Sequence, residues 1–232
     1  MRVSTLLEWG AILIIVLVTI LGIQSMGLFS PFNSSGPSTQ DAGASYSSPT
    51  CSELGLGGFY QEQLSGPQTF QQQIDDWTFT IQPVFRYTIV GKVVGKDEYS
   101  LVATDVLAPM DFAIANGEII SPELFRYFTF EKIPRHYRYR YSFPQGVRQL
   151  SREYVNEHIS NNHLIFANES VYAQAKTTAT NDFVVISGYL VTVSGKSRDG
   201  RTFSQGTSTT RSDQGEGACE VVYVESLEKT SC

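Results

Sequence analysis

One apolar run near the amino terminus constrains this chain more than any other feature of its sequence. From Trp9 to Ile23 every residue is apolar, glycine or threonine, and no charged residue follows before Asp41. About 20 such residues span the hydrocarbon core of a bilayer, and tryptophan is typical of the membrane interface. We therefore expect residues 1–29 to form a transmembrane anchor that includes Trp9, Ile15 and Ile23.

A cleaved signal peptide is the alternative interpretation of the same run. The apolar core from Ala11 to Ile23 fits a signal sequence, and Ser25-Met26-Gly27 provides the small residues of a cleavage site. The basic segment before this core is short, because only Arg2 and the amino terminus carry positive charge and Glu8 interrupts them. This composition favours a retained anchor.

Charge also predicts how the chain is oriented in the membrane. Arg2 and the α-amino group flank the run on its N-terminal side, whereas the next lysine or arginine is Arg86. Positively charged flanks stay in the cytoplasm. We expect a single-pass protein of the cell membrane, with its N-terminus in the cytoplasm and its C-terminal domain outside the cytoplasm.

Composition divides the exported part of the chain in two. From Ser30 to Gly58 the chain is rich in serine, glycine, proline and threonine and has no apolar period, which is typical of a flexible tether. A glutamine-rich approach segment follows and ends before Trp77. We therefore expect tether and approach segment at residues 30–76 and a folded β-rich domain at residues 77–232.

Alternation of apolar and polar residues dominates that domain, and its aromatic side chains also favour strands. Helical spacing replaces the alternation between Val147 and Ile159, and Asp199-Gly200 marks a hairpin turn. The alternating segments are Trp77–Gly95, His136–Phe143, Phe183–Gly195 and Cys219–Leu227. We expect an α+β fold that is mainly antiparallel β, either a small partly open barrel or a two-layer sheet, with one main helix.

Familiar catalytic signatures are absent from the sequence. It contains no glycine-rich phosphate loop, no GxSxG elbow, no HExxH pair and no paired CxxC motifs. The formal net charge of -6 and the isoelectric point of about 5.1 provide no global basic field for nucleic acid. We therefore expect no cofactor and no nucleic-acid partner, and an enzyme is the less favoured interpretation.

Two of the three histidines, His158 and His163, lie five residues apart. This spacing does not place them on one helix face, and a zinc site would need further ligands from elsewhere, such as Asp111, Asp213 or Cys219. The simpler interpretation places His158 in the last turn of the helix, where the helix dipole favours it. We therefore expect no metal site.

We expect the residues after His158 to form an irregular loop that follows that helix. Asn161 and Asn162 would bond the backbone of this loop, because asparagine side chains reach nearby backbone groups. Asn168 would cap a helical turn in "ESVYAQAKTTA". If the loop leaves His163 exposed to a cleft, these side chains could bind a ligand.

A glycine-rich segment, "TRSDQGEGACE", places Arg211 and Asp213 beside two glycines. This pair could bind a ligand, or it could fix a tight turn through bonds to the backbone. The candidate ligand- or partner-binding residues are therefore Asn161, Asn162, His163, Arg211 and Asp213.

The cysteines are odd in number: Cys51, Cys219 and Cys232. A Cys51–Cys219 disulfide would join the tether to the domain, and an oxidising compartment would permit it. The alternative is that Cys219 is a small buried residue and that all three thiols are free.

Three motifs, "SNNHLIFANE", "ISGYLVTVSG" and "TRSDQGEGACEVVYVESL", resemble a widespread group of bacterial membrane-anchored proteins of unassigned function. The resemblance covers about Trp77 to Leu227, and Phe166 stands where that pattern usually has proline. It implies one N-terminal transmembrane helix and an exported domain. It implies no activity, cofactor or catalytic residue.

We therefore expect a membrane-tethered extracytoplasmic domain that is a non-enzymatic binding or structural component of the cell envelope. Its partners would be the lipid bilayer, through the N-terminal helix, and an envelope protein. The alternative is a metal-dependent or other hydrolase that uses the His158/His163 loop.

The anchor can be tested by fractionating bacterial cells that express the full chain or a chain without residues 1–29. We expect the full chain to stay in carbonate-washed membranes and to be digested by protease added to spheroplasts, and the truncated chain to be soluble and protected. Intact-mass measurement should find the N-terminal segment retained. A mature chain that begins after Gly27 would contradict the anchor.

Overall fold

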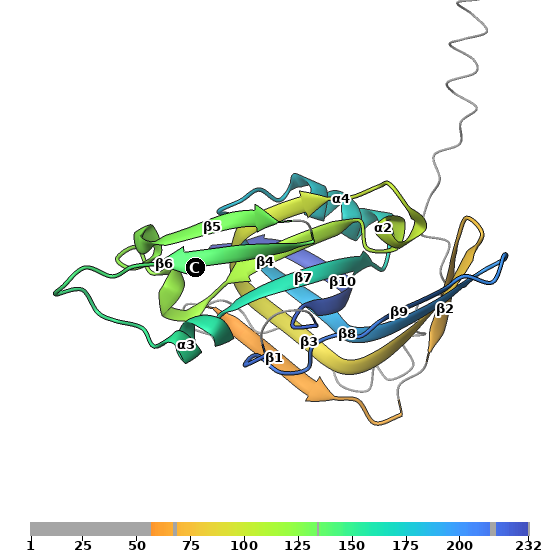
Figure 1. The fold of residues 1–232 in the computed structure, drawn as a ribbon, viewed down its shortest axis with the longest axis horizontal. Coiled ribbons are helices and arrows are strands. Elements are labelled where there is room, and N and C mark those ends of the chain that lie inside the picture. Colours follow the sequence, from red (N-terminus) through yellow and green to blue (C-terminus); the bar gives the residue numbers. More distant parts are fainter. Residues whose placement is uncertain (1–56, 67–68, 134, 214–216, 232) are drawn as a thin grey trace, which may run out of the picture. The chain divides into compact units, whose positions relative to one another are not determined.

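The computed structural model describes residues 57–66, 69–133, 135–213 and 217–231 (Figure 1). The expected anchor with Trp9, Ile15 and Ile23, most of the tether, and Cys51 lie outside these ranges. Among the described residues, no helix has both the length and the apolar character needed to cross a membrane. The described part is mostly antiparallel β-sheet with few helices, so the predicted β-rich α+β class is confirmed.

Ten strands and several short helices make up the described residues. The strands are β1 (Gly58–Gln63), β2 (Phe70–Ile74), β3 (Trp77–Glu98), β4 (Met110–Ala115), β5 (Phe128–Ile133), β6 (His136–Tyr141), β7 (Ile159–Phe166), β8 (Phe183–Ser197), β9 (Thr202–Gln205) and β10 (Glu220–Thr230). The helices are α2 (Ala103–Leu107), α3 (Arg152–Glu157) and α4 (Glu169–Thr177), with 3-10 turns η1 (Gly117–Ile120) and η2 (Phe125–Tyr127).

Five of the strands pair in a closed ring. β3 pairs with β4, β4 with β7, β7 with β10, β10 with β8, and β8 returns to β3. Every pair in the ring is antiparallel except β7–β10, which is parallel. β3 can close the ring because its 22 residues pair with β8 along one edge and with β2, β1 and β4 in succession along the other.

Alternation along the ring strands directs apolar side chains into one core. Phe112 on β4, Leu164 on β7 and Val222 on β10 are fully buried there, and Val171 and Ala175 of α4 pack against the same cluster. Asn168 begins α4, since its side chain accepts a hydrogen bond of 3.1 Å from the backbone N–H of Val171. The predicted cap and helical turns are therefore confirmed.

The hairpin β5–β6 covers part of the outer face of β3 and β4 (Figure 1). Aromatic side chains of this hairpin pack on Ala113 and Ala115, which point away from the core enclosed by the strand ring. Gly95 of β3 permits this approach, because a Cβ at Gly95 would lie 2.2 Å from the ring of Tyr137. The hairpin thus forms a wall beside the outer face of the β4–β7 pair.

The structure differs from the sequence predictions in three places. The sheet starts at β1 and β2, upstream of the domain boundary predicted at Trp77, because the glutamines of β2 alternate with buried Phe70 and Ile74. The helix predicted from Val147 to Ile159 is shorter in the structure. It is α3 (Arg152–Glu157), and the side chain of Ser151 caps its N-terminus.

The residues predicted to form the loop after that helix form strand β7 instead. β7 pairs with β4 on one edge and with β10 on the other, so the backbone groups of Asn161 and Asn162 are satisfied by the sheet. Pairing on both edges outweighs the local hydrogen bonds that asparagine could offer a loop.

Candidate functional site

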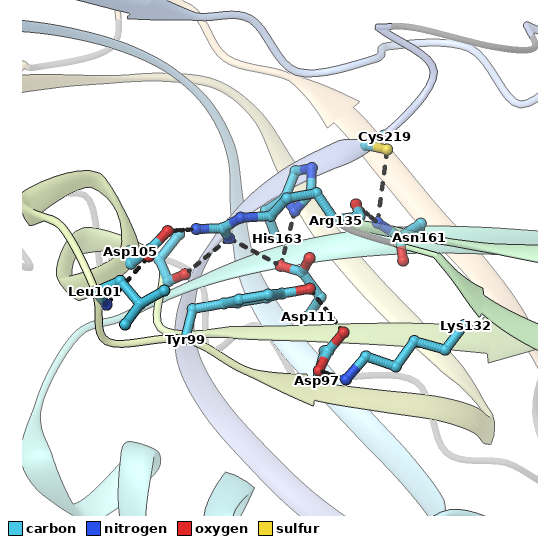
Figure 2. A network of polar contacts seen from close by, with 11 residues as sticks. Asp97, Tyr99, Leu101, Asp105, Asp111, Lys132, Arg135, Asn161, His163 and Cys219 are labelled. Carbon is cyan, nitrogen blue, oxygen red and sulfur yellow. Dashed lines mark hydrogen bonds and ion pairs between the residues drawn. The ribbon is translucent and has the colours of Figure 1, made fainter.

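Strands β4 and β7 and the residue before β10 place Asp111, His163 and Cys219 on the outer face of the strand ring (Figure 2). Asp111 on β4 is the antiparallel register partner of His163 on β7. On the other edge of β7, Glu220 is paired with Asn162, so Cys219, directly before β10, falls beside Asn161. These residues alternate with the inward-facing ones, because successive side chains in a strand point to opposite faces.

His163 is hydrogen-bonded between strands. Its Nδ1 lies 2.7 Å from Oδ1 of Asp111, whose carboxylate is fully buried, and the His163 residue is only 7% exposed. The side-chain amide of Asn161 donates to the backbone oxygen of Arg135 (3.1 Å) and to Sγ of Cys219 (3.6 Å). Cys219 is partly exposed.

Its surroundings hold His163 in the charged form. Burial alone would lower the pKa of His163, but hydrogen bonds to Asp111 and Cys219 and the charges of both groups outweigh burial and raise the pKa to about 9. At neutral pH the pair is therefore an imidazolium on a carboxylate.

A second cation reaches the same carboxylate. Arg135, directly before β6, pairs with Asp105 of α2, and its Nη1 lies 3.7 Å from Oδ1 of Asp111. Its guanidinium carbon lies 3.8 Å from the centre of the Tyr99 ring, which places the cation over the aromatic face. Two cations thus compensate the buried charge of Asp111.

The polar network continues beyond Tyr99. Its hydroxyl donates to Asp97 (2.9 Å), and Asp97 pairs with Lys132 of β5. Burial and the negative charges of Asp111 and Asp97 raise the pKa of Tyr99 above its ordinary value. Figure 2 shows this continuous path of polar side chains from Lys132 to Cys219.

One end of this path lines a pocket of about 840 Å³, through Arg135, Asn161, His163 and Cys219. One wall is strand β6 of the hairpin, and another is the segment around Arg211 and Cys219. The basic lining residues are Arg135, His136, Arg138, Arg152, His163 and Arg211, and the acidic ones are Asp213 and Glu220. A pocket of this size with a few convergent polar groups can hold a small ligand.

Four of the five predicted candidate residues line this pocket: Asn161, His163, Arg211 and Asp213. Asn162 does not, because its amide faces inward and donates to the backbone oxygen of Phe112 (3.1 Å) and to Ser160 Oγ (3.0 Å). Arg211 is a mostly buried side chain that pairs with Glu220. Asp213 accepts a hydrogen bond of 2.8 Å from Ser208.

The two histidines do not form a joint site. The ring of His158 stacks on Tyr154 at 3.8 Å and its Nδ1 lies 2.7 Å from the backbone oxygen of the same residue, away from the pocket. Among the described residues, no group of three or more histidine, cysteine, aspartate or glutamate side chains is placed to hold a metal ion.

The sequence did not indicate Arg135 or Tyr99 as site residues. It offered Asp111 only as a further metal ligand, whereas the structure bonds Asp111 to His163, and it places Cys219 in the lining of the same pocket as His163. One available signal was the charge of Asp111 within an otherwise apolar strand that is buried along its whole length. Cys219 carries a thiol, and the Cys51–Cys219 disulfide stays a prediction, since Cys51 lies outside the described ranges.

No protein-family model, no curated protein and no solved structure matches the chain.

The raised pKa of His163 predicts how stability depends on pH. The folded protein binds a proton at His163 up to about pH 9, whereas an unfolded histidine releases it near pH 6.5. This contribution to the free energy of unfolding is complete below pH 6.5 and is lost as the pH rises through 9, a change of the order of 3 kcal/mol. Denaturant unfolding at pH 6 and pH 10 should show this loss in the wild type and a smaller loss in His163→Gln. Equal losses in both proteins would contradict the assignment.

Proposed function

We propose that the described residues form the extracytoplasmic domain of a single-pass membrane protein and bind an anionic ligand in the pocket beside β6. The main support for this proposal is the concentration of basic side chains around this pocket, in a chain whose formal charge is -6. A local positive field in an acidic protein attracts anions to that place.

The positive charge of the pocket is not fully compensated within it. Arg138 on β6 and Arg152 on α3 are exposed at its edge, and neither has an ion-pair partner among the described residues. Of the two acids, Glu220 is paired with Arg211, and Asp213 is bound by Ser208. Arg138 and Arg152 are therefore the side chains free to meet a carboxylate or phosphate group, which guanidinium recognises through paired hydrogen bonds.

The order of the ring also supports a ligand at this position. In chain order the ring strands are β3, β4, β7, β8 and β10, and they pair as first-second-third-fifth-fourth. With α4 between the third and fourth strands, we infer a barrel of the oligonucleotide/oligosaccharide-binding type. Such barrels bind ligands on the face of the second and third strands and in the adjoining loops.

That face and those loops carry the residues described above. Asp111 lies on the second strand and His163 on the third. Tyr99 follows the first strand, and Arg211 and Cys219 lie in the connection between the fourth and fifth. The fold supports the place of binding and not the identity of the ligand.

A protein partner in the cell envelope could present the same anionic group as a side-chain or terminal carboxylate, so the predicted partner remains part of this proposal. The metal-dependent alternative needs His158 beside His163, and it loses support because His158 stacks on Tyr154 outside the pocket.

Binding can be tested with citrate and inorganic pyrophosphate as probes on the detergent-solubilised full chain. We expect both probes to raise the melting temperature, because a ligand that binds only the folded state stabilises it. In Arg138→Gln/Arg152→Gln, calorimetry should find binding weakened about tenfold, which corresponds to about 1.4 kcal/mol for two exposed charges.

The matched control is Arg126→Gln/Arg198→Gln. It removes the same charge from exposed positions that do not line the pocket. Equal weakening in both double variants would assign binding to net charge alone, and no stabilisation of the wild type by either probe would refute the anion site.

A further inference from the structure

We propose that the ligand of this pocket is an extended acidic peptide segment of a partner protein, which adds to β6 as a further strand on the side away from β5. The inference rests on the proposed function, because the peptide supplies the anionic groups that the pocket binds. It adds to that function a binding mode, the pairing of backbone groups, and a class of partner.

The pocket runs along an edge of β6 and not along one of its faces. Residues 135–139 line the pocket without interruption, whereas a strand that turned one face to a pocket would contribute only every second residue. In the described part of the chain β6 pairs only with β5, in a sheet of two strands (Figure 1). The edge away from β5 therefore borders the pocket, and such an edge presents N–H and C=O groups to a neighbouring strand.

A hydrogen bond in the pocket lining shows that backbone groups beside β6 are directed into the pocket. The side-chain amide of Asn161 on β7 donates to the backbone oxygen of Arg135 (3.1 Å), and both residues line the pocket. A carbonyl directly before β6 thus already accepts a hydrogen bond from this side. Strand addition repeats such bonds along the chain, and these main-chain bonds supply its affinity.

The hairpin holds β6 in place before a partner binds. The tyrosines of β6 share its half-buried face and pack on the outer side of β3 and β4, with Tyr137 over Gly95. The hydroxyl of Tyr139 also donates to the side chain of Asn156 on α3. A strand that is already fixed loses little conformational freedom when a partner is added, and this preorganisation favours binding.

Charge complementarity identifies the partner as acidic. Arg138 lies on the exposed face of β6, and Arg152 of α3 lines the same pocket. Opposite charges at facing positions of two paired strands stabilise the pair, whereas like charges destabilise it. A second copy of this chain would bring a second Arg138 to the antiparallel pairing of two β6 edges, so a segment with aspartate or glutamate on this face is the better partner.

The other face of the added strand meets apolar side chains. Ala113 of β4 and Ile159 of β7 line the pocket, and both pack in the same cluster as the tyrosines of β6. Successive side chains of a strand point to opposite faces. The recognised segment therefore alternates acidic residues with small or apolar residues.

The binding mode can be tested on the detergent-solubilised full chain with a fluorescein-labelled eight-residue peptide in which glutamate and valine alternate. Two further peptides carry N-methyl groups, one on every glutamate nitrogen and the other on every valine nitrogen, so each has lost the N–H groups of one strand edge. Because only one edge pairs with β6, anisotropy should find one methylated peptide at least tenfold weaker and the other equal to the parent. A peptide with glutamine in place of glutamate should also bind at least tenfold more weakly.

Hydrogen exchange measured by mass spectrometry locates the pairing. We expect the parent peptide to slow exchange of the backbone amides of β6 at least tenfold. β9 is an edge strand that does not line the pocket, and its exchange should stay unchanged as an internal control. Pyrophosphate offers charge without a strand and should leave exchange in β6 unchanged.

Arg138→Glu tests the facing charges. This exposed substitution should weaken the glutamate–valine peptide at least tenfold and allow a lysine–valine peptide to bind. The matched control Arg126→Glu, which is exposed and does not line the pocket, should do neither.

The outcomes separate strand addition from anion binding. If pyrophosphate stabilises the protein but both methylated peptides bind like the parent, or exchange in β6 does not slow, strand addition is refuted and the anion site stands. If neither pyrophosphate nor the parent peptide binds, both proposals fail. Slow exchange in β6 without peptide that depends on protein concentration would assign this edge to a second copy and would also refute the inference.

Discussion

The buried hydrogen bond between Asp111 and His163 is the contact on which the rest of the site depends. It joins two strands at directly opposite positions, so a shift of one residue in the β4–β7 register would turn the side chain of either Asp111 or His163 into the apolar core inside the strand ring. A buried carboxylate also needs positive partners, and Asp111 receives them from His163 and from Arg135. The contact therefore connects the register of the ring, the position of the segment before β6, and the charge of the histidine beside Cys219.

The parallel pairing of β7 with β10 brings Cys219 to the same side of the strand ring as Asn161 and His163. Parallel strands need a long connection, and here α4, β8, β9 and the glycine-rich segment run between the two strands. That path brings Cys219 back to Asn161, 58 residues earlier in the chain, and leaves Arg211 at the wall of the same pocket. The hairpin β5–β6 completes the pocket, because Gly95 lets the ring of Tyr137 rest on β3. The strand order that closes the ring thus also assembles the pocket.

Local signals in the sequence predicted local structure well. Asn168 caps α4 as predicted, Asp199-Gly200 connects β8 and β9, and the tyrosines of β6 share its half-buried face. The sequence failed where pairing over long distances decides the outcome. Periodicity cannot decide whether the short segment "HLIF" is a helix or a strand. It lies in strand β7 because both β4 and β10 pair with it. Likewise, His163 was a candidate ligand-binding residue, but its partner Asp111 lies 52 residues away in the chain. Only the β4–β7 register brings the two side chains into contact.

Nitrogen-15 NMR of the histidine rings tests the central claim most directly, because the chain contains three histidines and His163→Gln assigns the signal. We expect His163 to be an imidazolium at pH 7, to titrate near pH 9, and to titrate at lower pH in Asp111→Asn. A neutral His163 ring at pH 7, or a pKa of His163 that is unchanged in Asp111→Asn, would contradict the account.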